Sequence, residues 1–168
     1  MTDQPKKLTL LWTYVALPLA FFVLTLITAG IFYARLPQDV AYHFQGGSPD
    51  RWITRGVFIA WMTIPHILFI LLAVFLVRML MLGGRYIPEN KSPLPELLPL
   101  MGNMIALPQI VFFTAMLQLI FYNAYNTGIA PLWLPAVIIL ILGAIVLGFV
   151  FARLMRKYRT KKSKINQE

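Results

Sequence analysis

The sequence contains no cysteine and only six acidic residues among 168. The absence of cysteine excludes disulfide bonds, thiolate metal sites and cysteine nucleophiles, and it leaves the redox compartment undetermined. Charged residues make up 12% of the chain and apolar residues 59%, whereas an ordinary soluble domain has about 25% and about 45 to 50%. Because a small soluble core cannot bury so much apolar surface, we expect lipid to surround most of the chain.

Four long apolar stretches, none of which contains an acidic residue, cover 8–33, 57–82, 97–122 and 132–154. Each exceeds the roughly 20 residues that a helix needs to cross about 30 Å of hydrocarbon. Backbone groups in lipid must be hydrogen-bonded internally, which in runs of this length means helices. Residues 1–168 are therefore predicted to form a single membrane domain, an all-α integral membrane protein with a four-transmembrane-helix bundle. The first stretch is too long for a signal peptide, so we expect it to be retained as a span.

The lysines and arginines are distributed unequally between the two sides of this bundle. With four spans, the termini and the 82–96 loop share one side, which carries twelve of the fifteen basic residues. The 34–56 loop and the 123–131 turn share the other side, which carries Arg35, Arg51 and Arg55. The positive-inside rule then predicts a multi-pass protein of the cytoplasmic (plasma) membrane with both termini in the cytoplasm, an N-in/C-in topology.

Residues 155–168 form a basic tail directly after the last stretch. Attraction to anionic headgroups stabilises each nearby basic side chain by about 1 kcal/mol. Although a net charge of +9 would suggest nucleic acid in a soluble protein, the position of the tail predicts membrane lipids as its partners and no nucleic acid. The residues expected to contact lipid headgroups are Arg153, Arg156, Lys157, Arg159, Lys161, Lys162 and Lys164.

The 36–55 loop, LPQDVAYHFQGGSPDRWITR, is the densest cluster of polar and turn-forming residues outside the tail. Pro37 ends the first helix near Arg35. The alternation of apolar and other residues over 40–45 predicts a short extended segment with one apolar face against the bundle or the interface. The glycine pair 46–47 allows a turn, and the sequence Ser-Pro-Asp that follows is typical of a helix start, so a helix is expected to begin near Pro49. This helix could run straight into the second stretch, or form a short amphipathic turn in the interface before Thr54 caps a separate helix. A helix from Pro49 to Leu82 would be much longer than one bilayer, so tilt or a break near Gly56 is expected.

The same loop carries a pattern of residues found in a known family. Its elements are Leu36-Pro37, Val40-Ala41, His43-Phe44, Gly47, Pro49-Asp50, Trp52 and Thr54-Arg55. With this pattern, residues 10–80 resemble a bacterial and archaeal membrane domain of unknown function, which also forms the N-terminal part of SdpI-type immunity proteins. The usual pattern is about one residue longer before the Gly-x-Pro-Asp turn, often has Ser-Lys in place of Thr54-Arg55, and occurs in immunity proteins with more than four spans.

The resemblance implies an immunity or sensing role without a catalytic mechanism. SdpI-type proteins protect a cell against its own secreted killing peptide, so the outer loop would engage an external peptide, a lipid or an envelope partner. The residues to which the resemblance assigns this binding are Leu36, Pro37, His43, Gly47, Pro49, Asp50, Trp52 and Arg55.

Asp39, His43 and Asp50 offer oxygen and nitrogen donors that could surround a divalent cation. The alternative is structural: Asp50 caps a helix start or pairs with Arg51 or Arg55, while His43 bonds to the loop backbone. Because the three donors lack the close spacing of a metal motif, we favour the structural interpretation and predict no metal site and no cofactor.

His66 follows Pro65 about ten residues into the second stretch, roughly 14 Å from its outer end. An ionisable group at this depth is by default a functional hypothesis, although a neutral imidazole can be satisfied by one neighbour. The candidate partners on the third stretch are Asn103, Gln109 and Gln118. A structural role is favoured, and a ligand or proton site stays open.

The stretches contain no acidic residue for a carboxylate proton relay, which counts against a proton-coupled pump. The chain has no phosphate-binding glycine loop, no Gly-x-Ser-x-Gly elbow, no His-Glu-x-x-His helix and no visible pair of nucleophile and base, so we predict that it is not an enzyme. Pro18, Pro65 and Pro108 are each expected to interrupt one of the first three helices. Two function classes remain: an SdpI-like immunity or sensing protein, and a small-solute or ion permease, or an accessory membrane subunit of a larger complex, with a polar path near His66.

Overall fold

The computed structural model describes residues 12–84, 94–128 and 130–165, with the side chains of 94–96 and 157–165 left out. Most of this part of the chain is helical. In chain order its elements are α1 (Ala16–Phe32), β1 (Asp39–Gln45), β2 (Ser48–Thr54), α2 (Arg55–Gly84), α3 (Leu94–Asn103), α4 (Ala106–Tyr125) and α5 (Trp133–Ile165), with short 3₁₀ turns at Trp12–Tyr14 and Tyr33–Arg35.

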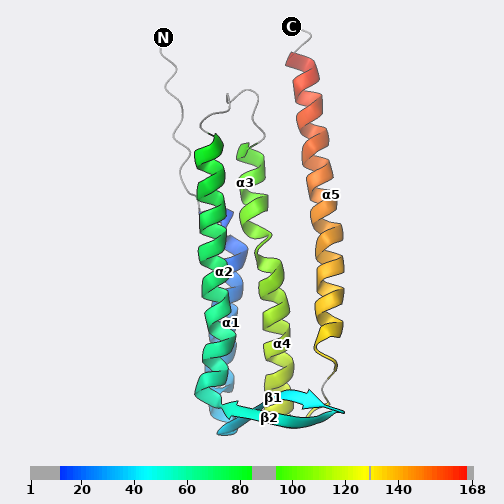
Figure 1. Ribbon diagram of the computed structural model, residues 1–168. Helices are drawn as coiled ribbons and strands as arrows, with labels where there is room; N and C mark the ends of the chain where they lie inside the picture. The colour runs from blue at the N-terminus through cyan, green and yellow to red at the C-terminus, as the bar shows by residue number, and fades with distance from the viewer. Residues whose placement is uncertain (1–11, 85–93, 129, 166–168) are drawn as a thin grey trace.

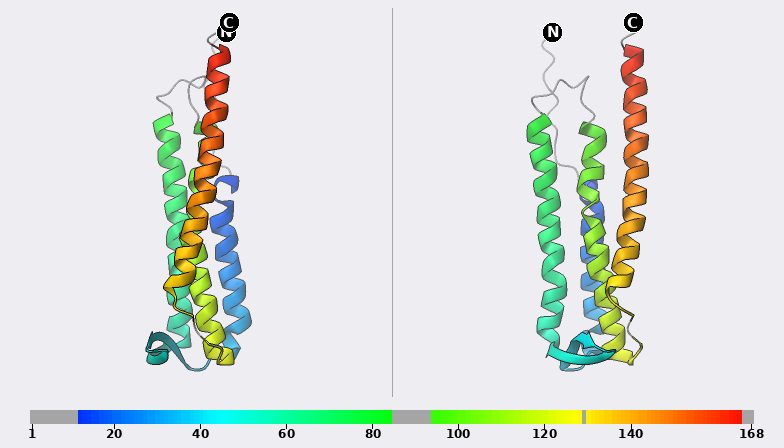
Figure 2. Two further views of the ribbon diagram at one scale, coloured as in Figure 1. Left: turned by 90° about the vertical axis from the view of Figure 1, so that its right-hand side faces the viewer. Right: turned by 45° about the vertical axis from the view of Figure 1, so that its right-hand side comes forward.

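The helices run side by side, and the two strands lie across one end of them (Figure 1), which we call the hairpin end. The helices α1, α2 and α4 pack against one another, and α3 packs against α2 at the opposite end. Helix α5 contacts α4 and stands at the side of this group, extending beyond the other helices at the opposite end (Figure 2).

Three helical segments are long and apolar enough to cross a membrane among the described residues. They are Arg55–Gly84, Leu97–Tyr125, which joins α3 and α4, and Trp133–Arg156 within α5. A shorter apolar helix, Ala16–Phe32, lies beside them. Most apolar side chains on α2 and α5 are exposed, which suits helices whose outer faces meet lipid rather than water. The chain therefore has the composition and helix lengths of a membrane protein.

The first apolar stretch forms a shorter helix than predicted. Helix α1 begins at Ala16 and has 17 residues, about 25 Å at about 1.5 Å per residue, and residues 8–11 of the predicted span lie outside the described part. The prediction that Pro18 interrupts the helix is wrong. Pro18 lies in the first turn of α1, where a backbone N–H has no helical partner to lose.

The third apolar stretch is divided, as Pro108 predicted. The Met104 N–H donates to the Leu100 carbonyl at 2.9 Å, and the Leu107 N–H donates to the Met104 carbonyl at 3.1 Å. Pro108 has no N–H to give that carbonyl its usual partner, so the chain takes this tighter step and α4 begins anew at Ala106. The prediction that Pro65 interrupts its helix is wrong, because α2 continues past Pro65 as one helix.

The predicted helix start at Pro49 is wrong, because residues 48–54 form the second strand of a β-hairpin. Gly46 and Gly47 both have positive φ, 60° and 85°, as a two-residue hairpin turn of the I′ type requires. This turn places Ser48 opposite Gln45 and Pro49 opposite Phe44 in an antiparallel register. The extended segment predicted at 40–45 is confirmed, and α2 begins only at Arg55, so no helix precedes Gly56 that could break there.

The buried core has two centres. At the hairpin end, Ala29, Leu36, Val40, Phe58, Met116, Leu119 and Ile120 form one cluster. At the opposite end, Tyr14, Val77 and Leu98 form another. There Gly102 allows a close approach of α3 to the 3₁₀ turn at Trp12–Tyr14, because a Cβ at this position would clash with the Tyr14 carbonyl oxygen and the Val77 side chain.

Candidate functional site

The β-hairpin of residues 39–54, which we call the hairpin cap, is hydrogen-bonded to α4 through the side chain of Asn123. The Asn123 Oδ1 accepts the Ala41 N–H at 2.8 Å, and the Asn123 Nδ2 donates to the Ala41 carbonyl at 2.9 Å. The same Nδ2 donates to the Leu119 carbonyl on its own helix at 2.8 Å. The Asn123 amide thus pairs with β1 as a neighbouring strand would, and it fixes the hairpin cap to α4.

The underside of the hairpin cap is apolar and packs into the core at the hairpin end. Val40 is fully buried and Ala41 nearly so, and Leu36 lies in the same cluster. The ring of Phe44 meets the ring of Tyr122 edge-on, with centroids 4.7 Å apart. The apolar face predicted for this segment therefore lies against the bundle.

The outer face of the hairpin cap carries a paired histidine and carboxylate. The His43 Nδ1 donates to the Asp50 Oδ1 at 2.6 Å across the two strands, and both side chains are partly exposed. The predictions that Asp50 caps a helix and that His43 bonds to the loop backbone are wrong, because Asp50 lies within β2 and faces His43. Asp39 lies four residues before His43 on β1, about 13 Å away along a strand, so the three candidate cation ligands are not brought together.

Two arginines lie at the base of the hairpin cap over aromatic rings. The guanidinium of Arg55, the first residue of α2, lies 4.8 Å from the centroid of the Tyr33 ring. The guanidinium of Arg35 lies 5.6 Å from the centroid of the Phe32 ring and donates to the Tyr125 hydroxyl. Such contacts stabilise a cation at the membrane interface without a carboxylate partner. These contacts were not predicted from the sequence.

The outer edge of β2 offers main-chain groups for pairing. In an antiparallel pair these groups point alternately toward the partner strand and away from it. The Arg55 N–H donates to the Gln38 carbonyl, and three residues further along β1 the groups of Ala41 point away, toward Asn123. Trp52 lies opposite Ala41 in the register, so its N–H and C=O point away from β1 at the other edge.

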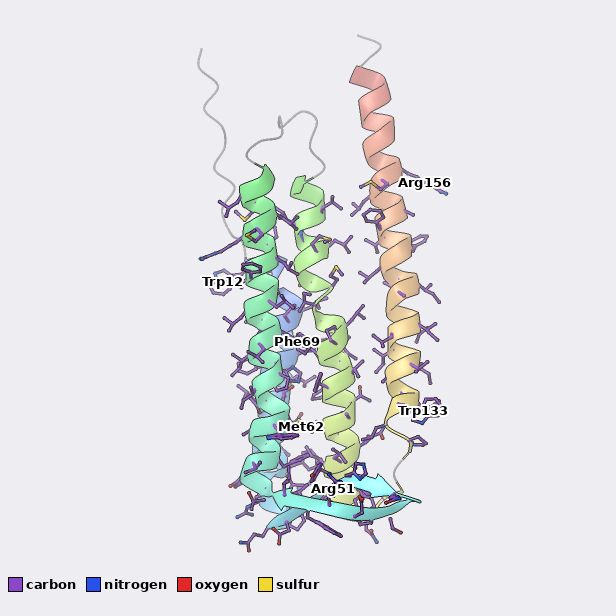
Figure 3. The ribbon with its side chains drawn as sticks, viewed as in Figure 1. Trp12, Arg51, Met62, Phe69, Trp133 and Arg156 are labelled. Atoms are coloured by element: carbon purple, nitrogen blue, oxygen red, sulfur yellow. The ribbon has the colours of Figure 1, made fainter. Side chains whose placement is uncertain are left out.

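Most of the eight predicted loop residues are collected in or beside the hairpin cap. Leu36 is buried beneath it, Pro37 is exposed before it, and Gly47 forms its turn. Pro49, Asp50 and Trp52 lie on β2, where the Trp52 side chain is 53% exposed. Figure 3 shows Arg51 at the hairpin end, Trp133 at the start of α5 and Arg156 toward the opposite end.

A second cluster of polar groups lies inside the bundle. Thr25 on α1, His66 on α2 and Gln109 on α4 are all fully buried, and we call them the core polar site. The Thr25 Oγ1 donates to the Phe21 carbonyl at 2.8 Å and lies 3.2 Å from the His66 Nε2. The Gln109 Nε2 donates to the His66 carbonyl at 3.1 Å. Of the predicted partners, Gln109 meets His66, and Thr25 was missed because a lone threonine in an apolar helix gives no signal.

The other two predicted intramembrane polar residues lie elsewhere. Asn103 holds the start of α1: its Oδ1 accepts the Leu17 N–H at 2.9 Å, and its Nδ2 donates to the Thr13 carbonyl at 2.8 Å and to the Pro99 carbonyl at 2.9 Å. The Gln118 Oε1 is buried without a hydrogen-bond partner among the described residues. Gln118 is nine residues beyond Gln109 on α4, about 13 Å along the helix, so it does not join the core polar site.

Of the seven basic residues predicted to contact headgroups, the structure describes the side chains of two. Arg153 and Arg156 are exposed on α5. The helix backbone continues to Ile165, but the predicted headgroup contacts of Lys157, Arg159, Lys161, Lys162 and Lys164 concern side chains outside the described part.

These features define a class: a membrane protein whose apolar helices carry a β-hairpin across one end. The family model for a domain of unknown function, DUF1648, matches residues 20–64. The matched segment includes most of α1, the whole hairpin cap and the first ten residues of α2, and it ends two residues before His66. Neither a curated protein nor a solved structure matches the chain.

Proposed function

We propose that this chain is a non-enzymatic, SdpI-like membrane protein that uses the hairpin cap to bind an external peptide or envelope partner. The match to the domain of unknown function covers the hairpin cap in full, and this supports the hairpin cap as the part that relatives share. In this proposal the partner has an extended segment, and binding protects the cell or reports the partner's presence.

The proposal includes a topology with four spans, both termini in the cytoplasm and the hairpin cap outside the plasma membrane. Helix α1 is the fourth span, and its 17 residues are extended by 3₁₀ turns at both ends. Arg55 and Arg78 are the basic residues on α2, and their separation of 23 positions corresponds to about 35 Å of helix, close to the thickness of a bilayer's hydrocarbon. The excess of basic residues on the side of the termini supports the orientation.

This topology is directly testable because the chain has no cysteine. We expect a membrane-impermeant maleimide to label Gln45→Cys in intact cells, and to label Ser163→Cys only after the membrane is opened. The reverse pattern would place the hairpin cap in the cytoplasm and remove the basis for an external partner.

The observation that carries the binding proposal is the outward edge of β2. An extended peptide can add to such an edge as a third strand, with main-chain hydrogen bonds for affinity and side-chain contacts for specificity. The edge strand β2 pairs with β1, and β1 is held in place by Asn123 and by the apolar underside, so little ordering is required on binding. Trp52 and Arg51 are exposed beside this edge, and both residue types are enriched where binding energy concentrates.

A photo-crosslinking amino acid at Trp52 tests the proposal in living cells. We expect an adduct with a secreted peptide or envelope protein at position 52 and none at Trp133, which is 65% exposed outside the hairpin cap. Trp52→Ala should then weaken binding of the captured partner by about tenfold or more, as expected for the loss of an exposed aromatic anchor. Equal crosslinking at both positions, or unchanged binding by Trp52→Ala, would contradict the proposal.

A second candidate, a small-solute or ion permease or an accessory membrane subunit, is favoured by one observation, the fully buried polar groups at His66. It predicts that His66→Ala abolishes solute flux in liposomes, whereas His43→Ala, Asp50→Ala and Arg55→Ala leave it intact. Sensitivity confined to the loop variants would exclude this candidate.

A further inference from the structure

The core polar site contains two atoms for which the described residues supply no hydrogen-bond partner. They are the His66 Nδ1 and the Gln109 Oε1, and both residues are fully buried. Buried polar atoms are nearly always hydrogen-bonded, so an unpaired pair in one cluster points to a bound species that completes it.

The chemistry of both atoms follows from their neighbours. Thr25 uses its only hydroxyl hydrogen on the Phe21 carbonyl, so toward the His66 Nε2 it must accept, and Nε2 carries the hydrogen. The Nδ1 of the neutral ring is then a lone-pair acceptor. The His66 carbonyl can only accept, so the Gln109 amide must present its Nε2 there and keep its Oε1 free. Both unpaired atoms are therefore acceptors.

The two unpaired acceptors, the His66 Nδ1 and the Gln109 Oε1, require a bound species that can donate two hydrogen bonds or that carries a positive charge. A cation would be buried without a neutralising carboxylate, since none of the four apolar stretches contains an acidic residue, and an uncompensated buried charge costs several kcal/mol. A neutral molecule with two donor hydrogens avoids this cost. We propose that the core polar site binds water, which donates hydrogen bonds to the His66 Nδ1 and the Gln109 Oε1.

A third neighbour extends the proposed water site along α2. Thr63 lies three residues before His66, so the two side chains are one helical turn apart. The Thr63 Oγ1 is also buried without a partner among the described residues. Because a buried water makes about three hydrogen bonds, the Thr63 hydroxyl supplies the remaining one. This hydration is independent of whether the hairpin cap binds a partner.

Nuclear magnetic resonance with ¹⁵N-labelled histidine tests this site, because the chain has only two histidines. In lipid nanodiscs, His43→Asn leaves His66 as the single imidazole. We expect Nε2 to carry the hydrogen, Nδ1 to show the shift of a lone pair that accepts a hydrogen bond, and magnetisation to pass from water to this ring. A hydrogen on Nδ1, or a free lone pair without transfer from water, would overturn the proposal.

Two glutamine substitutions on α4 provide the matched comparison. Gln109→Leu removes one of the two acceptors and should reduce the transfer from water to His66 at least twofold. Gln118→Leu makes the same chemical change nine residues away and should leave it unchanged. If Gln109→Leu does not fold, Gln109→Met, which keeps the length of the side chain, replaces it. If Gln109→Leu and Gln118→Leu reduced the transfer from water to His66 equally, the proposal would also be overturned, because the transfer would then not depend on an acceptor at the core polar site.

Discussion

The two ends of the bundle and its middle use side-chain amides in different ways. Asn123 at the hairpin end and Asn103 at the opposite end each bond to an N–H and a C=O of another segment and to a carbonyl four residues earlier in their own helix. Gln109 in the middle makes one such bond and keeps a buried acceptor unpaired. Complete pairing suits a structural clamp at each end, whereas incomplete pairing in the middle is what the proposed water site would complete.

Removing the clamp at the hairpin end should have the largest effect on stability. Asn123→Ala leaves the Ala41 N–H and C=O without their partners in a partly buried place, and each unpaired buried group costs about 1–3 kcal/mol. We expect a loss of about 2–4 kcal/mol in unfolding free energy and faster hydrogen exchange over residues 39–54. Thr127→Ala, at an exposed position just after α4, is the control and should change neither.

Removing the clamp at the opposite end should cost less. Asn103→Ala frees the Leu17 N–H and the Thr13 carbonyl, which lie where the first turn of α1 is more exposed to the surroundings. Because water or headgroups can replace part of this pairing, we expect a loss of about 1–2 kcal/mol, measured by the same unfolding assay. Hydrogen exchange should quicken at the start of α1 and stay unchanged in the hairpin cap. A loss larger than that of Asn123→Ala would reverse the order of the two clamps.

The middle should respond differently to loss of its amide. Gln109→Leu removes one hydrogen bond to the His66 carbonyl and also removes a buried acceptor that no described residue pairs and that only the proposed water would satisfy. The cost of burying that acceptor is removed together with its bond to water, so it offsets part of the loss. We expect the unfolding free energy to change by no more than about 1 kcal/mol in either direction. A loss as large as that of Asn123→Ala would show that Gln109 is a third clamp and that the contrast between ends and middle is wrong.

The apolar helices could be predicted from the sequence to different degrees. The stretch at 57–82 lies within α2, and the stretch at 132–154 lies within α5 apart from its first residue, because a long apolar run without acidic residues can satisfy its backbone in lipid only as a helix. Gln109 and Asn103 were both predicted as intramembrane polar residues, but Asn103 lies at the end of the bundle opposite the hairpin cap. Their different roles were not predicted, because these helices are apolar all round and the usual periodicity does not show which face is buried.

The hairpin cap shows the limit of local patterns more clearly. The alternation over 40–45 predicts β1 correctly, but Ser48-Pro49-Asp50 is a helix-start signal that the structure overrides. The turn at Gly46 and Gly47 aligns β2 with β1, and Asn123, 82 residues beyond Ala41, occupies the other edge of β1. A contact between residues so far apart in the chain cannot be predicted from local sequence patterns.

The smallest effect is expected from the polar pair on the exposed face of the hairpin cap. Asp50→Asn keeps the size of the side chain and a hydrogen-bonding oxygen but removes the charge opposite His43. Both side chains are partly exposed, at 54% for His43 and 33% for Asp50, and exposed pairs contribute about 0–1 kcal/mol. Unfolding free energy should therefore fall by less than about 1 kcal/mol, with His43→Asn as the reciprocal control and the double variant no worse than either single one. A drop comparable to that of Asn123→Ala would mean that the hairpin cap is held from its outer face as well as from α4, and the division between a fixed underside and an outer face available to a partner would fail.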